Sequence, residues 1–198
     1  MGKGGEMGFD FVKDLKKGWL PNTLTLIGVL CIPWIIYSHV IQKIAICGFF
    51  FAIAWIMDYL DGKASRVYGQ TSQTGAFFDP LADKIFTISM LIYCWVDIPA
   101  FISVPVIAIG VALTSLRIYK VNYGKKKDVE YSIMAAMADK LKTNVEKIAF
   151  AILLVISPVL VSHGLITEAT GILMANIFLS ISLVFAGFSL AHQLKTTL

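Results

Sequence analysis

The stretch that decides the fold reads DYLDGKASR at residues 58–66 and continues as GAFFDPLAD at residues 75–83. These two segments, which we call the aspartate hairpin, place four aspartates, one arginine and two glycines inside a strongly apolar sequence. A charged side chain at membrane depth is expensive and usually marks a functional site whose partner offsets that cost. We therefore predict that the hairpin is the functional centre of a membrane protein and that its partner is a metal ion.

The composition places the chain outside the soluble globular class. Of its 198 residues, 57% are hydrophobic and 15% charged, and the mean hydropathy is +0.75. These values are typical of an integral membrane protein and predict a single membrane domain over residues 1–198. The three cysteines lie in apolar tracts without metal-ligand spacing, which favours neither disulfides nor zinc. The basic residues gather in particular loops, a pattern that indicates membrane topology and no nucleic-acid partner.

Six apolar tracts approach the roughly 20 residues that a helix needs to cross a bilayer. We expect an all-α fold with six transmembrane helices over residues 20–198, preceded by an amphipathic interfacial helix over residues 1–19. In that first segment, Phe11, Val12 and Leu15 recur at helical spacing among lysines and aspartates. The six tracts run near Pro21–Ile41, Ile44–Asp61, Gly75–Val96, Ile98–Arg117, Val145–Ile166 and Ala169–Ala191.

Lysine and arginine positions predict the orientation in the membrane. With the N-terminus inside, Lys43 falls on the outer side and Lys84 within the third helix, while the other basic residues face the cytoplasm. This asymmetry predicts a plasma (inner) membrane protein whose two termini and aspartate hairpin face the cytoplasm, with residues 62–74 as a cytoplasmic loop. The inward set is Lys3, Lys13, Lys16, Lys17, Lys63, Arg66, Arg117, Lys120, Lys125, Lys126, Lys127, Lys140, Lys142, Lys147 and Lys195.

The spacing of the aspartates indicates a shared cation site. Asp58 and Asp61 are three residues apart and Asp79 and Asp83 four apart, so each pair projects from one face of its helix. An antiparallel hairpin brings the two pairs to the same depth, where one or two Mg²⁺ or Mn²⁺ ions would neutralise them. The alternative is a set of interface ion pairs with Lys63, Arg66 and Lys84.

The neighbouring glycines and arginine point to a phosphate ligand. Gly62 and Gly75 leave room where a side chain would stand, and Arg66 offers a fork of donors suited to phosphate oxygens. Carboxylates for metal, arginine for phosphate and glycines for close approach together indicate a diphosphate bound through divalent cations. The predicted chemistry is displacement at phosphorus.

The pattern Asp-x-x-Asp-Gly-x-x-Ala-Arg, followed by Gly-x-x-x-Asp-x-x-x-Asp, resembles the signature of the CDP-alcohol phosphotransferases. Ser65 stands here where that family usually has alanine. The resemblance implies a six-helix membrane enzyme, usually homodimeric, with two divalent metal ions in a cavity facing the cytoplasm. It implies that Asp58, Asp61, Asp79 and Asp83 bind metal, that Asp83 is also the general base, and that CDP is bound by Asp61, Gly62, Ser65, Arg66 and Gly75.

Three further segments are similar to the phosphatidylglycerophosphate synthases within that family: residues 21–25 with Pro33, residues 79–84, and residues 140–143 at the expected start of the fifth helix. Gly28 replaces an arginine common there, and Asp139 and Glu146 replace glycine and glutamine. This resemblance implies transfer of the phosphatidyl group from CDP-diacylglycerol to glycerol 3-phosphate, yielding phosphatidylglycerol phosphate and CMP. Alternatives within the family use inositol phosphate, serine or phosphatidylglycerol as acceptor, or an archaeal ether-lipid CDP donor.

Basic residues at the expected ends of the fourth and fifth helices are candidates for binding the acceptor phosphate. Arg117, Lys140 and Lys142 would converge on the cytoplasmic mouth. The alternative is that they only set topology and attract anionic membrane lipids.

Two other classes fit the sequence less well. Intramembrane prenyltransferases have more helices and lack the Gly62, Arg66 and Gly75 framework. A divalent-cation transporter would more often carry its broken helices in two symmetric halves, whereas here the acidic residues lie in one hairpin.

Overall fold

The computed structural model describes residues 19–67, 73–123 and 129–195, with side chains at residues 22–61, 63, 81–116, 138 and 140–194. The expected interfacial helix over residues 1–19 therefore lies outside the described residues, apart from its last residue. Every described element is helical. In chain order they are α2 (Trp19–Val40), α3 (Ile44–Val67), α4 (Gln73–Tyr93), α5 (Ala100–Tyr123), α6 (Val129–Ala151), η1 (Ile152–Ile156), α7 (Ser157–Ser162) and α8 (Glu168–Lys195).

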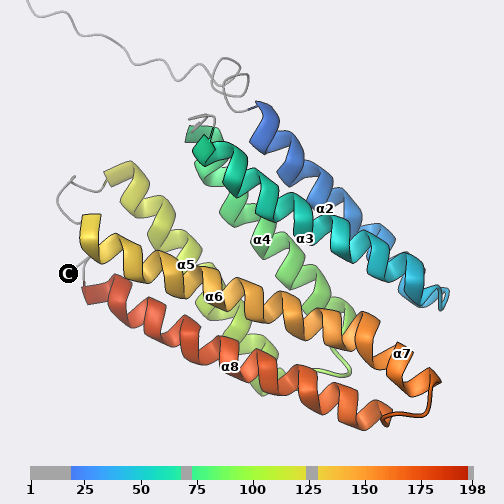
Figure 1. Ribbon diagram of the computed structural model, residues 1–198. Helices are drawn as coiled ribbons and strands as arrows, with labels where there is room; N and C mark the ends of the chain where they lie inside the picture. The colour runs from blue at the N-terminus through green and yellow to red at the C-terminus, as the bar shows by residue number, and fades with distance from the viewer. Residues whose placement is uncertain (1–18, 68–72, 124–128, 196–198) are drawn as a thin grey trace, which may run out of the picture.

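In the described part of the chain these elements form six long rods, because α6, η1 and α7 continue one another (Figure 1). The residues flanking η1 keep right-handed helical dihedrals, so η1 is a π-helical turn inside a longer helix. The rods run roughly along one direction. The starts of α2, α4 and α6 and the ends of α3, α5 and α8 lie at the same end of the bundle (Figure 1).

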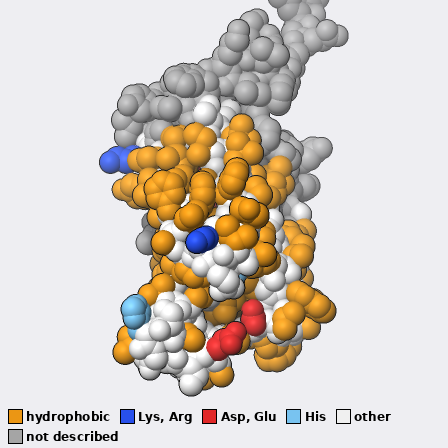
Figure 2. Space-filling model, turned by 90° about the vertical axis from the view of Figure 1, so that its right-hand side faces the viewer, with side chains coloured by type: hydrophobic (Ala, Val, Ile, Leu, Met, Phe, Trp, Pro, Cys, Tyr) orange, Lys and Arg blue, Asp and Glu red, His pale blue; other side chains and the backbone are white. Residues whose placement is uncertain are grey.

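Length and apolar character support an integral membrane protein. Among the described residues, four helical segments are long and apolar enough to cross a bilayer: Asn22–Val40, Ile44–Asp61, Lys140–Ser162 and Glu168–Leu194. Helix α5 contributes a shorter apolar stretch, Ala100–Leu116. The predicted membrane character is thus confirmed, with four of the six expected spans. Hydrophobic side chains cover most of the face shown in Figure 2, as a lipid-facing surface requires.

Two predicted boundaries were wrong, and both concern the end of the bundle that carries the acidic residues. Helix α3 continues to Val67 and α4 begins at Gln73, so much of the expected loop 62–74 is helical. Helix α6 begins at Val129, well before the expected opening of the fifth helix at residues 140–143 and its apolar tract from Val145. Alanine, methionine, lysine and glutamate are strong helix formers, and they carry α6 beyond the apolar window by which a membrane span is recognised.

The core beneath the acidic residues is aromatic. Phe86 of α4 packs edge-on against Phe51 of α3 with ring centroids 5.7 Å apart, and against Phe150 of α6 at 6.3 Å. All three rings are buried. Phe86 lies three residues after Asp83, about one helical turn, so this contact fixes α3, α4 and α6 relative to one another next to the site.

The cysteines agree with the sequence analysis. Cys31, Cys47 and Cys94 are buried free thiols. The Sγ of Cys47 lies 3.9 Å from the carbonyl oxygen of Leu154 within the π-helical turn. They pack as small core residues.

Candidate active site

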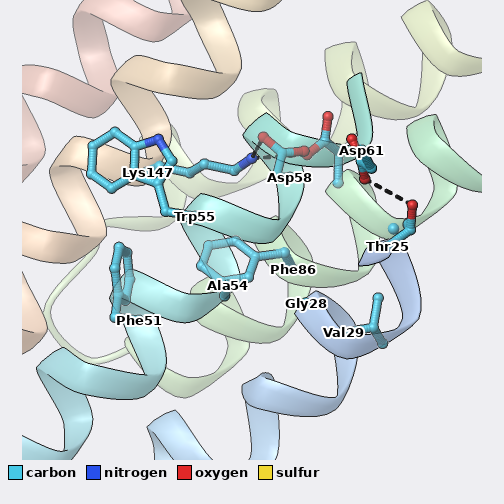
Figure 3. A pocket seen from close by; sticks show the side chains of 12 residues that line it. Thr25, Gly28, Val29, Phe51, Ala54, Trp55, Asp58, Asp61, Phe86 and Lys147 are labelled. Carbon is cyan, nitrogen blue, oxygen red and sulfur yellow. Dashed lines mark hydrogen bonds and ion pairs between the residues drawn. The ribbon is translucent and has the colours of Figure 1, made fainter. Parts of the chain in front are cut away.

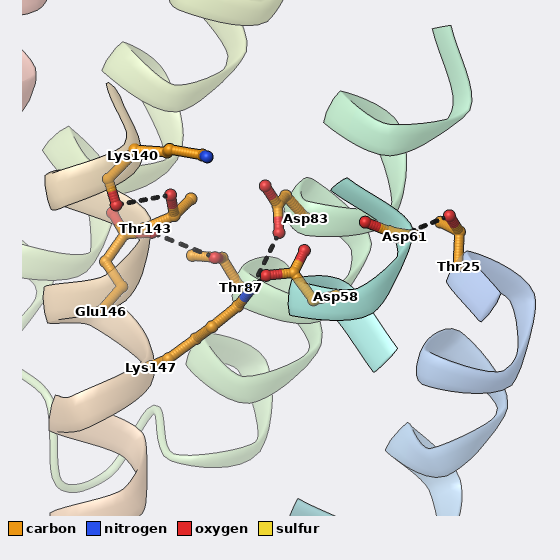
Figure 4. Close-up of polar contacts among 9 residues, drawn as sticks. All are labelled: Thr25, Asp58, Asp61, Asp83, Thr87, Lys140, Thr143, Glu146 and Lys147. Atoms are coloured by element: carbon orange, nitrogen blue, oxygen red, sulfur yellow. Dashed lines mark hydrogen bonds and ion pairs between the residues drawn. The ribbon is translucent and has the colours of Figure 1, made fainter. Parts of the chain in front are cut away.

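Two carboxylates of the aspartate hairpin meet one lysine. The Nζ of Lys147, from α6, lies 2.6 Å from Oδ2 of Asp58 and 3.1 Å from Oδ1 of Asp83 (Figures 3 and 4). Lys147 is 6% exposed, whereas the side chains of Asp58 and Asp83 are 43% and 28% exposed. Helices α3 and α4 both pack against α2, and this arrangement brings one aspartate of each pair to a common cation.

Asp61, which lines the same cavity as Asp58 and Asp83, is held by a different helix. It is 6% exposed, and its Oδ2 accepts a hydrogen bond of 2.8 Å from Oγ1 of Thr25 on α2 (Figure 4). Asp58 and Asp61 therefore start from adjacent turns of α3 but face different neighbours. Sequence reasoning had not assigned Thr25 this role, because the contact joins residues that are 36 positions apart.

A cavity lies between α2, α3, α4 and α6, with a polar and an apolar side (Figure 3). Carboxylates, one hydroxyl and one ammonium line the polar side. Aromatic and small aliphatic residues line the rest. The complete lining is Thr25, Gly28, Val29, Phe51, Ala54, Trp55, Asp58, Asp61, Ala82, Asp83, Phe86 and Lys147.

A second polar cluster is buried beside this cavity. The Nζ of Lys142 lies 2.9 Å from Oε1 of Glu146, and both side chains are 1% exposed. Thr87 of α4 donates a 3.1 Å hydrogen bond to Oε2 of Glu146 (Figure 4). A β-carbon built on Gly110 of α5 would stand 3.6 Å from Nζ of Lys142 and 3.5 Å from Nζ of Lys84. The cluster therefore links α4, α5 and α6 through a fully buried ion pair.

The residues predicted to bind the acceptor phosphate separate in the structure. Lys140 is exposed, and in Figure 4 its side chain extends from α6 in the direction of Asp83. Lys142 is buried against Glu146 rather than open at the mouth. Both lie inside α6 and do not open a helix, since α6 starts at Val129. Arg117 lies in α5, and its side chain is outside the described residues.

The remaining predicted residues lie in helices whose side chains are not described at these positions. Gly62, Ser65 and Arg66 belong to the last turns of α3, and Gly75 and Asp79 to the first turns of α4. Asp79 is therefore within a helix that also carries Asp83. The contacts of these five residues lie outside the described part of the structure.

Lys147 is the site residue that sequence reasoning missed. It was counted among the cytoplasmic lysines that set the topology, yet the structure buries it between two aspartates. The ion pairs that the described structure shows for Asp58 and Asp83 are with this lysine, and the side chain of Arg66 lies outside the described residues. The signal was available, because Lys147 lies inside the tract expected to span the membrane, where a charged residue is by default functional.

The donor set suits a hard divalent cation. Oxygens of Asp58 and Asp83 already converge on one positive charge, and carboxylate oxygens are the ligands that Mg²⁺ and Mn²⁺ prefer. Among the described residues, no group of three or more acidic, histidine or cysteine side chains is assembled for metal. Asp61 faces Thr25, and the side chain of Asp79 lies outside the described structure. The described site thus supplies two converging carboxylates, those of Asp58 and Asp83, and a third carboxylate, that of Asp61, about one helical turn from Asp58.

Comparison with known proteins gives one consistent result. A family model described as CDP-alcohol phosphatidyltransferase matches residues 18–188. A protein of Salmonella choleraesuis (strain SC-B67) is 32% identical over 145 residues, which cover 68% of this chain and 76% of the relative. Proteins of Escherichia coli (strain K12) and Sodalis glossinidius (strain morsitans) are 31% and 30% identical over the same coverage. All three are named CDP-diacylglycerol--glycerol-3-phosphate 3-phosphatidyltransferase.

Proposed function

Because the chain belongs to the CDP-alcohol phosphatidyltransferase family, we propose that it transfers the phosphatidyl group of CDP-diacylglycerol to glycerol 3-phosphate. The products are phosphatidylglycerol phosphate and CMP. The observation that carries the proposal is the convergence of Asp58 and Asp83 beside a cavity with an apolar wall. The names of the relatives favour glycerol 3-phosphate as the acceptor.

The cavity suits a substrate that is part lipid and part phosphate. Its apolar side includes Phe51, Ala54 and Trp55 (Figure 3). Its acidic side includes Asp58 and Asp83 (Figure 4). A phosphate bound through cations at the carboxylates would leave the attached diacylglycerol next to apolar side chains. This division of polar and apolar walls is what a lipid-linked nucleotide needs.

The four aspartates Asp58, Asp61, Asp79 and Asp83 would hold Mg²⁺ or Mn²⁺, with two ions as the expected number. The bound metal would neutralise the diphosphate and stabilise the phosphate of the departing CMP. In the protein itself, Thr25 orients Asp61 by its hydrogen bond. Such outer contacts fix the direction in which a ligating carboxylate points.

Asp83 is the proposed general base. Its side chain is 28% exposed, so a soluble acceptor can reach it. As the acceptor oxygen forms its bond to phosphorus and the bond from phosphorus to CMP breaks, the hydroxyl proton moves to the Asp83 carboxylate. Its contact with Lys147 and its position in the cavity lining support this role.

The two substrates would bind to different sets of residues. Asp61, Gly62, Ser65, Arg66 and Gly75 would contact the CDP moiety. The acceptor phosphate would be held by Arg117, Lys140 and Lys142. Lys140 is the best supported of these three, because its side chain is exposed and extends in the direction of Asp83. Lys142 already forms an ion pair with Glu146, which would compete with the acceptor phosphate for its ammonium group.

The wider architecture is also proposed. The chain would form one domain over residues 1–198 that crosses the inner membrane six times, α4 and α5 included, and acts as a homodimer. The site would face the cytoplasm, where a soluble acceptor and a membrane-borne donor can meet. The asymmetric distribution of lysine and arginine in the sequence supports this orientation.

The test is release of CMP by the purified full chain supplied with CDP-diacylglycerol, glycerol 3-phosphate and Mg²⁺. Asp83→Asn should abolish release, whereas Asp97→Asn, which makes the same change in the turn after α4, should retain it. A panel of inositol phosphate, serine, phosphatidylglycerol and an ether-lipid CDP donor tests the alternatives. The proposal fails if CMP is released equally well without an acceptor, or if no acceptor or donor in the panel leads to CMP release. Uptake of Mn²⁺ by vesicles that contain the protein, without CMP release, would favour a transporter.

A further inference from the structure

Lys147 occupies the point at which Asp58 and Asp83 converge. Its ammonium is 2.6 Å from one carboxylate and 3.1 Å from the other, and no closer ion pair involves either aspartate among the described residues. It arrives from α6, which is separate from the hairpin that supplies the carboxylates (Figure 4). The contact therefore depends on the tertiary packing of three helices.

The surroundings hold the lysine in this place. It is 6% exposed, and its stem lines the same cavity as Trp55 and Phe86 (Figure 3). Three residues further along α6, Phe150 is locked in the aromatic core. A surface lysine samples many rotamers. The side chain of Lys147 is instead held by its buried surroundings, with its ammonium directed at Asp58 and Asp83.

We propose that Lys147 is a resident counter-cation of the site, which binds Asp58 and Asp83 in alternation with a divalent metal ion. This inference rests on the metal site of the proposed function and adds a residue to which no role in it has been assigned. Without metal, the ammonium keeps two carboxylates of neighbouring helices together against their repulsion. When metal binds to these oxygens, the ammonium gives up its contacts.

Size makes the two states exclusive. Mg²⁺ binds oxygen ligands at about 2.0–2.1 Å, which is closer than either ammonium contact. A metal ion that used the same two oxygens would compete with Nζ for them, because two cations so close together repel each other. Metal binding therefore has to displace the lysine, and its apparent affinity is lowered by that competition.

Removal of the lysine charge should therefore tighten metal binding. For Lys147→Met, we expect the apparent dissociation constant for Mn²⁺ to fall at least about tenfold, the factor equivalent to about 1.4 kcal/mol of lost competition. Free Mn²⁺ would be counted by electron paramagnetic resonance in titrations of the full chain in lipid nanodiscs, without substrate. Lys147→Gln should behave alike and keeps a donor for the aspartates in case the methionine variant fails to fold.

Lys140→Met is the matched control, because it removes the same charge from α6 two turns earlier at an exposed position. It should leave the Mn²⁺ affinity within about twofold, a change of about 0.4 kcal/mol. In the unaltered protein, saturating Mn²⁺ should increase labelling of Lys147 by an amine-reactive reagent, read by mass spectrometry. Unchanged Mn²⁺ affinity in both Lys147 variants, or labelling of Lys147 that Mn²⁺ does not increase, would overturn the proposal.

The outcome is independent of CMP release, since no substrate is present. If the enzyme assay fails while the affinity shift is found, the counter-cation stands and the reaction is wrong. If CMP is released and the affinity does not shift, the reaction stands and the counter-cation is wrong.

Discussion

The buried ion pair between Lys142 and Glu146 offers the sharpest test of how α6 is held. Both side chains are 1% exposed and their charged atoms lie 2.9 Å apart, with Thr87 donating a further 3.1 Å hydrogen bond to Glu146. Replacing Lys142 by methionine would leave the buried carboxylate of Glu146 without its ion-pair partner. Breaking a buried pair in this way lowers the free energy of unfolding by about 3–5 kcal/mol. We expect Lys142→Met and Glu146→Met each to lower the free energy of unfolding by an amount in that range.

The double variant Lys142→Met with Glu146→Met should behave differently from either single variant. A buried ion pair replaced by apolar residues of similar volume is often neutral for stability. The hydroxyl of Thr87 loses its acceptor, which costs about 1–3 kcal/mol if no other is found. We therefore expect the double variant to regain most of the lost stability, with a residual deficit of that size.

The assay is reversible denaturation of the purified protein in one detergent, followed by circular dichroism. Lys140→Met is the control, because it removes an exposed lysine two residues away and should change stability by no more than about 0.5 kcal/mol. The reasoning is refuted if Lys142→Met is no more destabilising than this control. It is also refuted if the double variant is as unstable as the worse single variant.

The same double variant decides what Lys142 does in the reaction. If Lys142 holds the acceptor phosphate, KM for glycerol 3-phosphate should rise by about 10-fold or more, in keeping with the loss of one charge-assisted hydrogen bond of about 1.5–3 kcal/mol. KM for CDP-diacylglycerol should stay unchanged. An unchanged KM for glycerol 3-phosphate in a stable double variant would make the lysine a structural residue.

Two further substitutions follow from single contacts. Thr25→Val removes the hydrogen bond to Asp61 and should lower the Mn²⁺ affinity about 10–100-fold. Thr170→Val, which makes the same change at the start of α8, should leave the Mn²⁺ affinity unchanged. If the two variants had equal effects, Thr25 would not be the residue that positions Asp61 for metal binding. Gly171→Ala would drive its new methyl group into Ser157 and should destabilise the protein by about 1–3 kcal/mol, as measured by denaturation. Adding Ser157→Gly should restore most of the loss, and a failure to do so would mean that the overlap is not the cause.

Much of the site was predictable because its carboxylates are close in sequence. The spacing of Asp58 and Asp61, and of Asp79 and Asp83, fixes which helix faces they leave. One aspartate of each pair, Asp58 and Asp83, meets the same lysine, whereas Asp61 accepts a hydrogen bond from Thr25.

The helix boundaries were less predictable for a physical reason. A membrane span is recognised by its apolar window, but a helix ends where its backbone hydrogen bonds and side-chain propensities end. Helix α6 therefore begins at Val129, 11 residues before the expected opening of the fifth helix at Lys140. That extension moves Lys142 from an expected helix start into the packed interior.

By itself, the sequence determined the membrane class, the helical rods and the acidic hairpin, because composition and local spacing act within one helix or between two that are joined. The tertiary structure alone decided that Lys147 fills the space between Asp58 and Asp83, that Thr25 holds Asp61, and that Lys142 is buried with Glu146. Lys147 lies 89 positions from Asp58 and 64 from Asp83. Which distant side chain meets which carboxylate depends on how α2, α4 and α6 pack around α3, and no periodicity within one helix encodes that choice.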